Sequence, residues 1–296
     1  MPDGTLIAAL SQDDHWQRRL AAFNADRFTP RLPDADASWE QNIAAQAALL
    51  VEEGHWLEAK RAEVSARAAE APRDPDGFVR WFERLEHEGP GQADPLFPWL
   101  AQHADMAEMK WFLQQEVAVE AGFEDLTAIT QVRLPQRAKL ELARNYWDEM
   151  GRGNAKGMHG PMLEHLSAKL GLQPRVETTV WESLALANTM AGLACSRRYA
   201  YQSVGAMGVI EQTAPGRAKL VGEGLRRLGV SGKDRHYFDL HAILDVKHSA
   251  AWNAEAAWPL VAENPDWAPA LAEGALMRLE AGAACFRRYR EVLGIN

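Results

Sequence analysis

The spacing of apolar residues predicts a protein built of α-helices. Apolar positions recur every three or four residues along most of the chain, and Ala, Leu, Glu, Arg and Gln occupy many of the positions between them. Runs of β-branched residues are almost absent, and no sustained alternation of apolar and polar residues occurs. The nearest strand candidate, TTVW at 178–181, stands at the start of a predicted helix. We therefore predict an all-α multihelical bundle.

Prolines and glycines divide this pattern into helices. The glycines within 203–208 are expected to interrupt one long helix, and Pro215 is expected to end the segment that follows them. The Pro- and Gly-rich stretch at 88–97 is the best candidate for a domain boundary, which predicts an N-terminal helical extension over 1–95 and a larger bundle over 96–296. The expected helices cover 13–27, 38–69, 76–87, 95–130 with a break near His103, 135–150, 161–170, 176–201, 218–228, 233–258 and 267–293.

Composition and charge argue against several classes of partner. The formal net charge is -9, so the chain lacks the cationic surface that nucleic acids and anionic membranes attract. No secretory signal and no apolar run of about 20 residues is visible, and we expect a cytoplasmic protein. Cys195 and Cys285 lie far apart in apolar helical stretches, which is typical of buried, reduced thiols. Metal-binding Cys pairs, phosphate loops and hydrolase motifs are missing.

The most informative segment is 235–248, RHYFDLHAILDVKH. His241, Asp245 and His248 are spaced by four and then three residues, which places them on one face of a helix. Phe238 shares this face, so we expect it to point inward. Two imidazoles and a carboxylate on an inward face suit iron, manganese or zinc. The alternative interpretation is a partly exposed polar face with an ordinary Asp–His pair.

A metal site in a helical bundle needs carboxylates from other helices, because a dinuclear centre is usually bridged by Glu or Asp. Glu116 shares a helix face with Phe112 and Phe123, and burying an acid among aromatic rings is costly unless it meets a cation. Glu120 lies on a neighbouring, more polar face with Glu124, which favours a solvated or supporting role. Glu116 is therefore the preferred ligand of this helix.

Glu149 and His159 are a second pair of candidate ligands. Ten residues separate them, and a regular helix would turn their side chains about 80° apart. The glycines at 151, 153 and 157 provide the interruption that both need to reach one metal ion. The alternative interpretation of His159 is an ordinary histidine at a helix start, before Pro161.

Glu211 is the only acid between Glu182 and Glu223, and it follows an apolar, glycine-containing run. The glycines are expected to bend this helix and to let a substrate or O2 approach a metal ion. A solvated glutamate near a helix end is the alternative. The candidate walls of a substrate pocket are Trp147, Met190, Met207, Val209 and Leu244.

In chain order, these acids and histidines resemble the heme-oxygenase-like diiron oxidases and oxygenases, the iron-containing redox enzymes built on the heme oxygenase bundle. The resemblance covers roughly residues 96 to 265. It implies a heme-oxygenase-like fold, two Fe(II) ions per chain and O2 as co-substrate. A third histidine makes the set more similar to the N-oxygenase branch. The implied metal ligands are Glu116, Glu149, His159, Glu211, His241, Asp245 and His248.

The resemblance also implies roles within this set. Glu149 or Glu211 is expected to bridge the two irons. His159 and His241 or His248 are expected to supply their imidazole ligands, with Asp245 as a further carboxylate. No catalytic residue is implied beyond the metal ligands.

The resulting hypothesis is an O2-dependent non-heme diiron oxidoreductase that acts on a small organic molecule by N-oxygenation, decarboxylation or C–C cleavage. One alternative is a non-catalytic helical binding protein without metal. Another is a cofactor-free, thiaminase-like enzyme on the same fold, with Cys195 as nucleophile. The extension over 1–95 could pack on the bundle, form the interface of a homodimer or cover the access to the active site.

Overall fold

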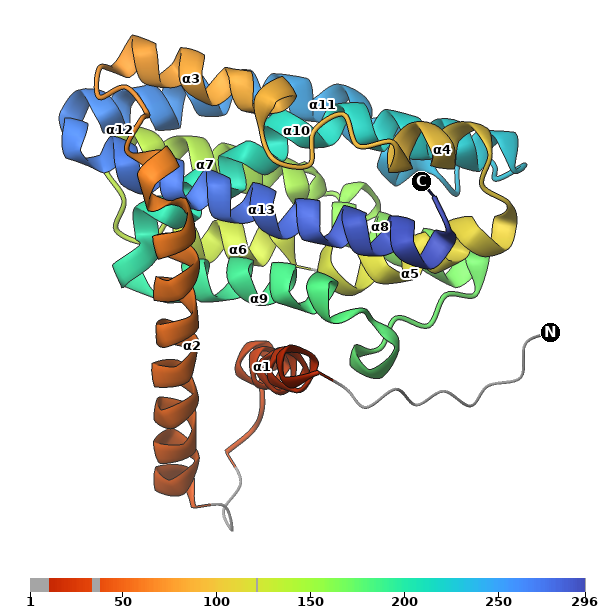
Figure 1. The fold of residues 1–296 in the computed structure, drawn as a ribbon, viewed down its shortest axis with the longest axis horizontal. Helices are drawn as coiled ribbons and strands as arrows, with labels where there is room; N and C mark the ends of the chain where they lie inside the picture. Colours follow the sequence, from red (N-terminus) through yellow and green to blue (C-terminus); the bar gives the residue numbers. More distant parts are fainter. Residues whose placement is uncertain (1–10, 34–37, 121, 296) are drawn as a thin grey trace.

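The computed structural model describes residues 11–33, 38–120 and 122–295, without the side chains of Val119 and Glu120. Within these residues the chain is helical and contains no strand (Figure 1). The helices are α1 Gln12–Phe28, α2 Trp39–Ala68, α3 Pro75–Glu88, α4 Leu96–Gln102, α5 Met106–Glu120, α6 Phe123–Thr130, α7 Gln136–Glu149, α8 His159–Leu170, α9 Trp181–Cys195, α10 Ala200–Arg227, α11 His236–Trp252, α12 Trp258–Glu263 and α13 Ala268–Leu293.

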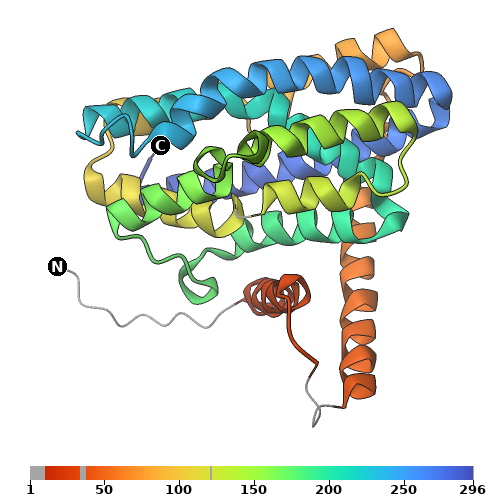
Figure 2. The same ribbon diagram turned by 180° about the vertical axis from the view of Figure 1, so that it is seen from behind.

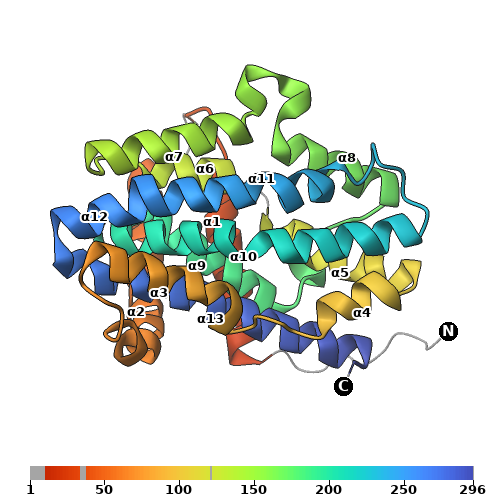
Figure 3. The same cartoon turned by 90° about the horizontal axis from the view of Figure 1, so that it is seen from above.

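Helix α10 occupies the centre of the bundle. It packs most extensively against α11 and α13, and it also contacts α3, α4 and α9. Figure 3 shows α10 with α11 on one side and α13 on the other. Sixteen of its residues are buried, so its stability comes from packing on several sides rather than from one amphipathic face.

The expected interruption of α10 at 203–208 is wrong, because α10 runs without a break over its whole length. Its glycines serve close packing instead. A Cβ atom at Gly205 would lie 1.8 Å from the backbone oxygen of Leu271, and one at Gly208 would lie 2.3 Å from the indole nitrogen of Trp252. Only glycine lets these neighbours approach so closely. Pro215 does not end the helix either, since it lies inside it.

Helix α11 also continues further than expected. The helix was expected to stop before Pro259, but a π-helical segment, Asn253–Ala257, joins α11 directly to α12. Pro259 lies in the first turn of α12. The break expected near His103 is confirmed, because α4 and α5 are separate helices, and a second break separates α5 from α6.

The first three helices pack on the bundle. Helix α1 lies on α9, α3 lies on α10 and α12, and α2 contacts α13 and α9. Leu57 of α2 and Phe78 of α3 belong to the same apolar cluster as Val204 of α10 and Leu276 of α13. The N-terminal part of α2 projects from the bundle (Figure 1), and Trp39 is exposed there. The division at residue 95 stays a prediction.

In the described part of the chain, none of the helices has the length and apolar character needed to cross a membrane. Cys195 and Cys285 are free thiols, the first half-buried and the second buried. Burial raises the pKa of both. The expected burial therefore holds for Cys285 and only in part for Cys195.

Candidate metal centre

Four helices place the candidate ligands at one position in the bundle. Glu149 ends α7, His159 begins α8, Glu211 lies in α10, and α11 carries both His241 and His248. Helix α11 contacts each of α7, α8 and α10, and Figure 2 shows it from the side on which α7 and α8 lie. Residues from 149 to 248 therefore meet through tertiary packing.

Glu149, His159 and His241 form the first cluster. One donor atom from each lies within 4.8 Å of the other two. Glu149 Oε2 is 2.7 Å from His159 Nδ1, and His159 Nδ1 is 3.0 Å from His241 Nε2. Burial lowers the pKa of His159 to about 4, and burial also lowers the pKa of His241. Both imidazoles are thus neutral near pH 7, which is the form that binds metal ions.

A backbone contact fixes the orientation of His241. Its Nδ1 lies 2.7 Å from the carbonyl oxygen of Tyr237, and a carbonyl oxygen can only accept, so Nδ1–H is the donor. In the neutral ring this leaves a lone pair on Nε2, which faces His159. Metal-binding histidines are commonly oriented in this way by a second hydrogen bond.

Glu149, Glu211 and His248 form the second cluster, again with donor atoms within 4.8 Å of one another. His248 Nδ1 lies 3.4 Å from Glu211 Oε2. On the other side of the ring, Nε2 lies 3.2 Å from Asp148 Oδ2. Nδ1 is buried and makes no hydrogen bond to the described groups. A buried ring nitrogen without such a bond is a natural ligand atom.

Glu149 belongs to both clusters, and its side chain is buried. Burial raises the pKa of this carboxyl to about 8, although the charge of His241 opposes the shift. A carboxylate shared by two neighbouring donor sets occupies the place that a bridging ligand takes in a dinuclear site.

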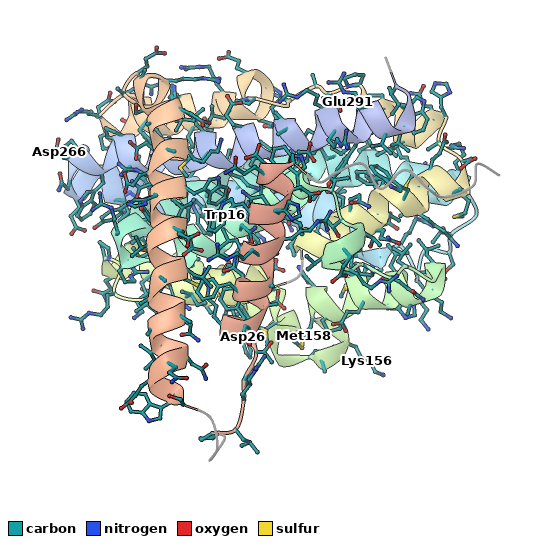
Figure 4. All side chains as sticks on the ribbon, turned by 60° about the horizontal axis from the view of Figure 1, so that its bottom comes forward. Trp16, Asp26, Lys156, Met158, Asp266 and Glu291 are labelled. Atoms are coloured by element: carbon teal, nitrogen blue, oxygen red, sulfur yellow. The ribbon has the colours of Figure 1, made fainter. Side chains whose placement is uncertain are left out.

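The loop between α7 and α8 brings Glu149 and His159 together. Gly151 has a φ of 60°, and a Cβ atom there would lie 2.4 Å from the backbone of Gly157, so the loop closes tightly on itself. An isolated β-bridge joins Met150 to Met158. Met158, at the end of this loop, is labelled in Figure 4. The glycine-rich segment therefore interrupts the helix as expected. His159 lies at the N-terminus of α8, two residues before the expected start of this helix.

Glu116 and Asp245 stand outside both clusters. Asp245 is buried, and its Oδ1 lies 3.8 Å from His248 Nδ1. Glu116 accepts a hydrogen bond of 2.9 Å from the hydroxyl of Tyr289, and both acids line the adjacent cavity. The choice between Glu116 and Glu120 stays open, because the Glu120 side chain lies outside the described residues.

Two supporting residues were missed in the sequence. Asn145 is buried and donates a hydrogen bond of 2.6 Å from Nδ2 to Glu211 Oε1. Asp148 holds His248 and also accepts from Arg152. Asn145 precedes Glu149 by four residues, and this spacing places both on one helix face. No comparable sequence signal distinguishes Asp148 from a surface acid.

A cavity of about 90 Å³ adjoins both clusters, and Glu149, Glu211 and His241 form part of its wall. Two arginines, Arg217 and Arg278, also line it. The apolar part of the wall includes Phe112, Phe123, Leu163, Ile210, Phe238 and Phe286.

Of the five expected pocket walls, none lines this cavity, and only Met190 lines a second one. Met207 and Val209 are fully buried in the core, and Trp147 is 53% exposed. Met190 lines a different cavity, and Leu244 is not part of either lining. A helical period shows which residues share a face, but only the packing of neighbouring helices decides which face meets a cavity.

The residues of both clusters fit iron. The first holds two ring nitrogens 3.0 Å apart in a hydrogen bond, and a bound cation could replace the shared proton as the partner of both nitrogens. The second contains the buried Nδ1 of His248, which makes no hydrogen bond to the described groups. Mixed imidazole and carboxylate donors suit iron or manganese better than structural zinc.

A family model described as an iron-containing redox enzyme matches residues 110–283. The chain belongs to this family. The matched segment contains all seven ligands expected from the sequence. It begins later than the expected resemblance, at 110 rather than about 96, and it reaches into α13, which the expected range to 265 did not. The predicted family and the all-α heme-oxygenase-like bundle are thereby confirmed. No curated protein matches the chain.

Solved structures support the same fold. This family member is similar to a CADD-like protein of unknown function from Nostoc punctiforme, with a TM-score of 0.57 and 17% identity over 74% of this chain and 95% of that chain. A second crystal structure titled as a CADD-like protein from that organism gives a TM-score of 0.52 and 16% identity over 82% and 98% of the two chains. At these identities the likeness concerns the fold.

Cys195, the nucleophile of the cofactor-free alternative, ends α9 and is not part of the cavity lining. Burial raises the pKa of its thiol, although the charge of Arg27 opposes this. A thiol with a raised pKa is a poor nucleophile. The structure therefore offers this alternative no support.

Proposed function

We propose that this member of the iron-containing redox enzyme family is a non-heme diiron oxidase or oxygenase that uses O2 to oxidise a small organic molecule. The observation that carries the proposal is the position of Glu149, which is common to two buried donor clusters beside a cavity. N-oxygenation, decarboxylation and C–C cleavage are the reaction types that we consider.

The ligands would divide between two ions. Glu149, His159 and His241 would hold one iron, and Glu211 and His248 would hold the other, with Glu149 shared. Asp245 is the nearest further carboxylate. Bound iron would supply the electrons and the open coordination positions that O2 chemistry requires.

The surrounding residues would orient the ligands and limit access of water. The Tyr237 carbonyl fixes the ring of His241, Asp148 fixes that of His248, and Asn145 holds one oxygen of Glu211. Each contact preserves the free lone pair or oxygen that faces the cluster. The aromatic and aliphatic cavity wall keeps the reacting end of a substrate in an apolar environment.

Iron content tests the proposal directly. Protein reloaded with Fe(II) without oxygen should hold about two iron ions per chain. The Glu149→Ala variant should lose most of the iron at both positions, because the change removes the shared ligand. His159→Ala and His248→Ala should each retain about one. Elemental analysis by mass spectrometry measures these contents.

His165→Ala is the matched control, since His165 lies on α8 with His159 but pairs with Asp234 at 2.8 Å. It should keep the iron content of the unmodified chain. A non-catalytic binding protein would hold no stoichiometric iron in any variant. Oxygen consumption that survived both His241→Ala and Asp245→Ala would also overturn the proposal.

A further inference from the structure

Arg278 is a buried cation in the middle of α13. Its side chain lines the cavity beside the metal clusters, and the residue is only 7% exposed. Its Nε makes no hydrogen bond to the described groups. Two other arginines of α13 do have acidic neighbours, since Arg288 lies near Glu182 and Arg290 near Asp94. Arg278 occurs in none of the ion pairs found among the described residues.

The local sequence makes room for this guanidinium. Gly282 follows four residues later on the same helix, and a Cβ atom there would lie 2.9 Å from Nη1 of Arg278. The other cavity arginine is engaged differently. Arg217 donates to the hydroxyl of Thr213 at 3.2 Å, and its guanidinium lies over the ring of Phe286.

Arg278 also lines a second cavity of about 440 Å³, between α1, α6 and α9. The two cavities share four lining residues, which places Arg278 at the partition between them. The shared residues are Phe123, Leu186, Ile210 and Arg278.

Apolar side chains dominate the wall of the second cavity, with Phe28, Leu126 and Met190 among them. Its other polar lining residues carry no positive charge. Asn24 and Asn188 bond to each other at 2.8 Å, and Asp125 is exposed. The wall of the first cavity contains four acids, Glu116, Glu149, Glu211 and Asp245. Arg278 is therefore the cation at the partition where an anionic group can be held away from these acids.

We infer that Arg278 binds the anionic group, a carboxylate, of a substrate whose apolar remainder lies in the adjoining cavities. This inference rests on the proposed function only in calling the ligand a substrate. The binding itself can be measured without turnover. A buried charge is costly without a partner, and a guanidinium pairs with a carboxylate through two parallel hydrogen bonds. A bound carboxylate would supply the partner that the described chain does not.

Three probes with the same apolar chain test the charge requirement: octanoate, octanamide and octylammonium. Calorimetry under nitrogen, with Fe(II)-loaded and with metal-free protein, measures their binding. The unmodified chain should prefer octanoate over octanamide, and octylammonium should bind weakest. Arg278→Met should weaken the binding of octanoate by about tenfold or more and leave the binding of octanamide unchanged. Arg278→Lys should retain part of the preference, because it keeps the charge but loses the two-bond geometry.

Arg287→Met is the matched control, since Arg287 is an exposed arginine on the same helix. It should bind octanoate as the unmodified chain does. Thermal unfolding separates ligand binding from a structural role. Replacing a buried, unpaired charge by an apolar side chain of similar length should leave the unfolding temperature unchanged or raise it, whereas a structural arginine would lower it.

Equal affinity of the unmodified chain for octanoate and octanamide would overturn the inference without any variant. So would octanoate binding that Arg278→Met leaves intact. These results are independent of the iron measurements. Charge-selective binding without stoichiometric iron would refute the proposed function alone, and two irons with no charge selectivity would refute this inference alone.

Discussion

At the scale of single residues, two ligand candidates hold protons that a metal ion must displace. Burial raises the pKa of Glu149 to about 8, with the charge of Glu211 adding to the shift. Burial alone would lower the pKa of His248, but the Glu211 carboxylate 3.4 Å away and the hydrogen bond to Asp148 raise it to about 9. Near pH 7 both groups are protonated in the metal-free chain. Metal binding is therefore linked to proton release.

We expect the stabilisation of the chain by Mn(II) to increase with pH. The stability that protonated Glu149 and His248 give the metal-free chain is fully present below their ordinary pKa values of 4.5 and 6.5. It is lost as the pH rises through about 8 and about 9. Bound metal replaces these protons, so the difference in unfolding temperature with and without Mn(II) should widen from pH 6.5 upward.

Asp148→Asn provides a control for this pH dependence. It removes a bond that raises the pKa of His248. The difference in unfolding temperature between the metal-bound and the metal-free chain should therefore widen less with pH. His159 does not alter the sign. The stability linked to its lowered pKa is present above 6.5 and is lost only as the pH falls through about 4. A difference that stayed constant or narrowed with rising pH would contradict the assignment of both groups.

At the scale of helices, the centre depends on how closely α10 and α13 approach each other. A Cβ atom at Gly274 would lie 1.7 Å from the backbone oxygen of Gln202, and one at Gly205 would lie 1.8 Å from that of Leu271. Each helix thus presents a glycine to the backbone of the other. Glu211 lies further along α10, so this contact sets its position relative to α7 and α11.

Gly274→Ala should lower the free energy of unfolding by about 2 kcal/mol or more, because backbone atoms cannot move aside as a flexible side chain can. Chemical denaturation measures this loss. Gly216→Ala is the matched control in α10, since nothing lies within 4 Å of a Cβ atom there. It should leave the stability unchanged or raise it by up to about 1 kcal/mol. Similar effects of the two changes would show that the close approach is unimportant.

At the scale of the whole molecule, the N-terminal helices contribute to the core of the bundle. Leu57 is 1% exposed and belongs to the cluster that includes Leu193 of α9 and Leu276 of α13. Figure 4 shows α1 and α2 lying over the side of the bundle that faces the viewer. The lining of the second cavity includes α1 residues such as Ala21 and Phe28. These observations favour packing on the bundle as one role of α1, α2 and α3.

Leu57→Ala should lower the free energy of unfolding by about 2–5 kcal/mol, because it leaves a cavity in a shared core. The signals of the many tryptophans should report this loss of stability in a single unfolding transition. Leu50→Ala on the same helix is the control. Leu50 is 47% exposed, so its truncation should change the stability by less than about 0.5 kcal/mol. Equal losses, or separate transitions, would argue for an independent N-terminal unit.

The sequence by itself determined the helical class and the common face of one residue triplet. His241, Asp245 and His248 share a face because the helical repeat places residues three and four apart together, and no distant contact is needed for that. The glycines between Glu149 and His159 likewise indicated locally that the helix is interrupted there.

Tertiary structure decided how these residues combine. Glu149 belongs to two clusters only because α7, α8, α10 and α11 converge, and no local pattern encodes that convergence. The same holds for Gly205 and Gly208, which appeared to break a helix and instead admit the neighbouring backbone and the Trp252 ring. Arg278 carried no signal in the sequence, because a buried and an exposed arginine look alike until the surrounding helices are in place.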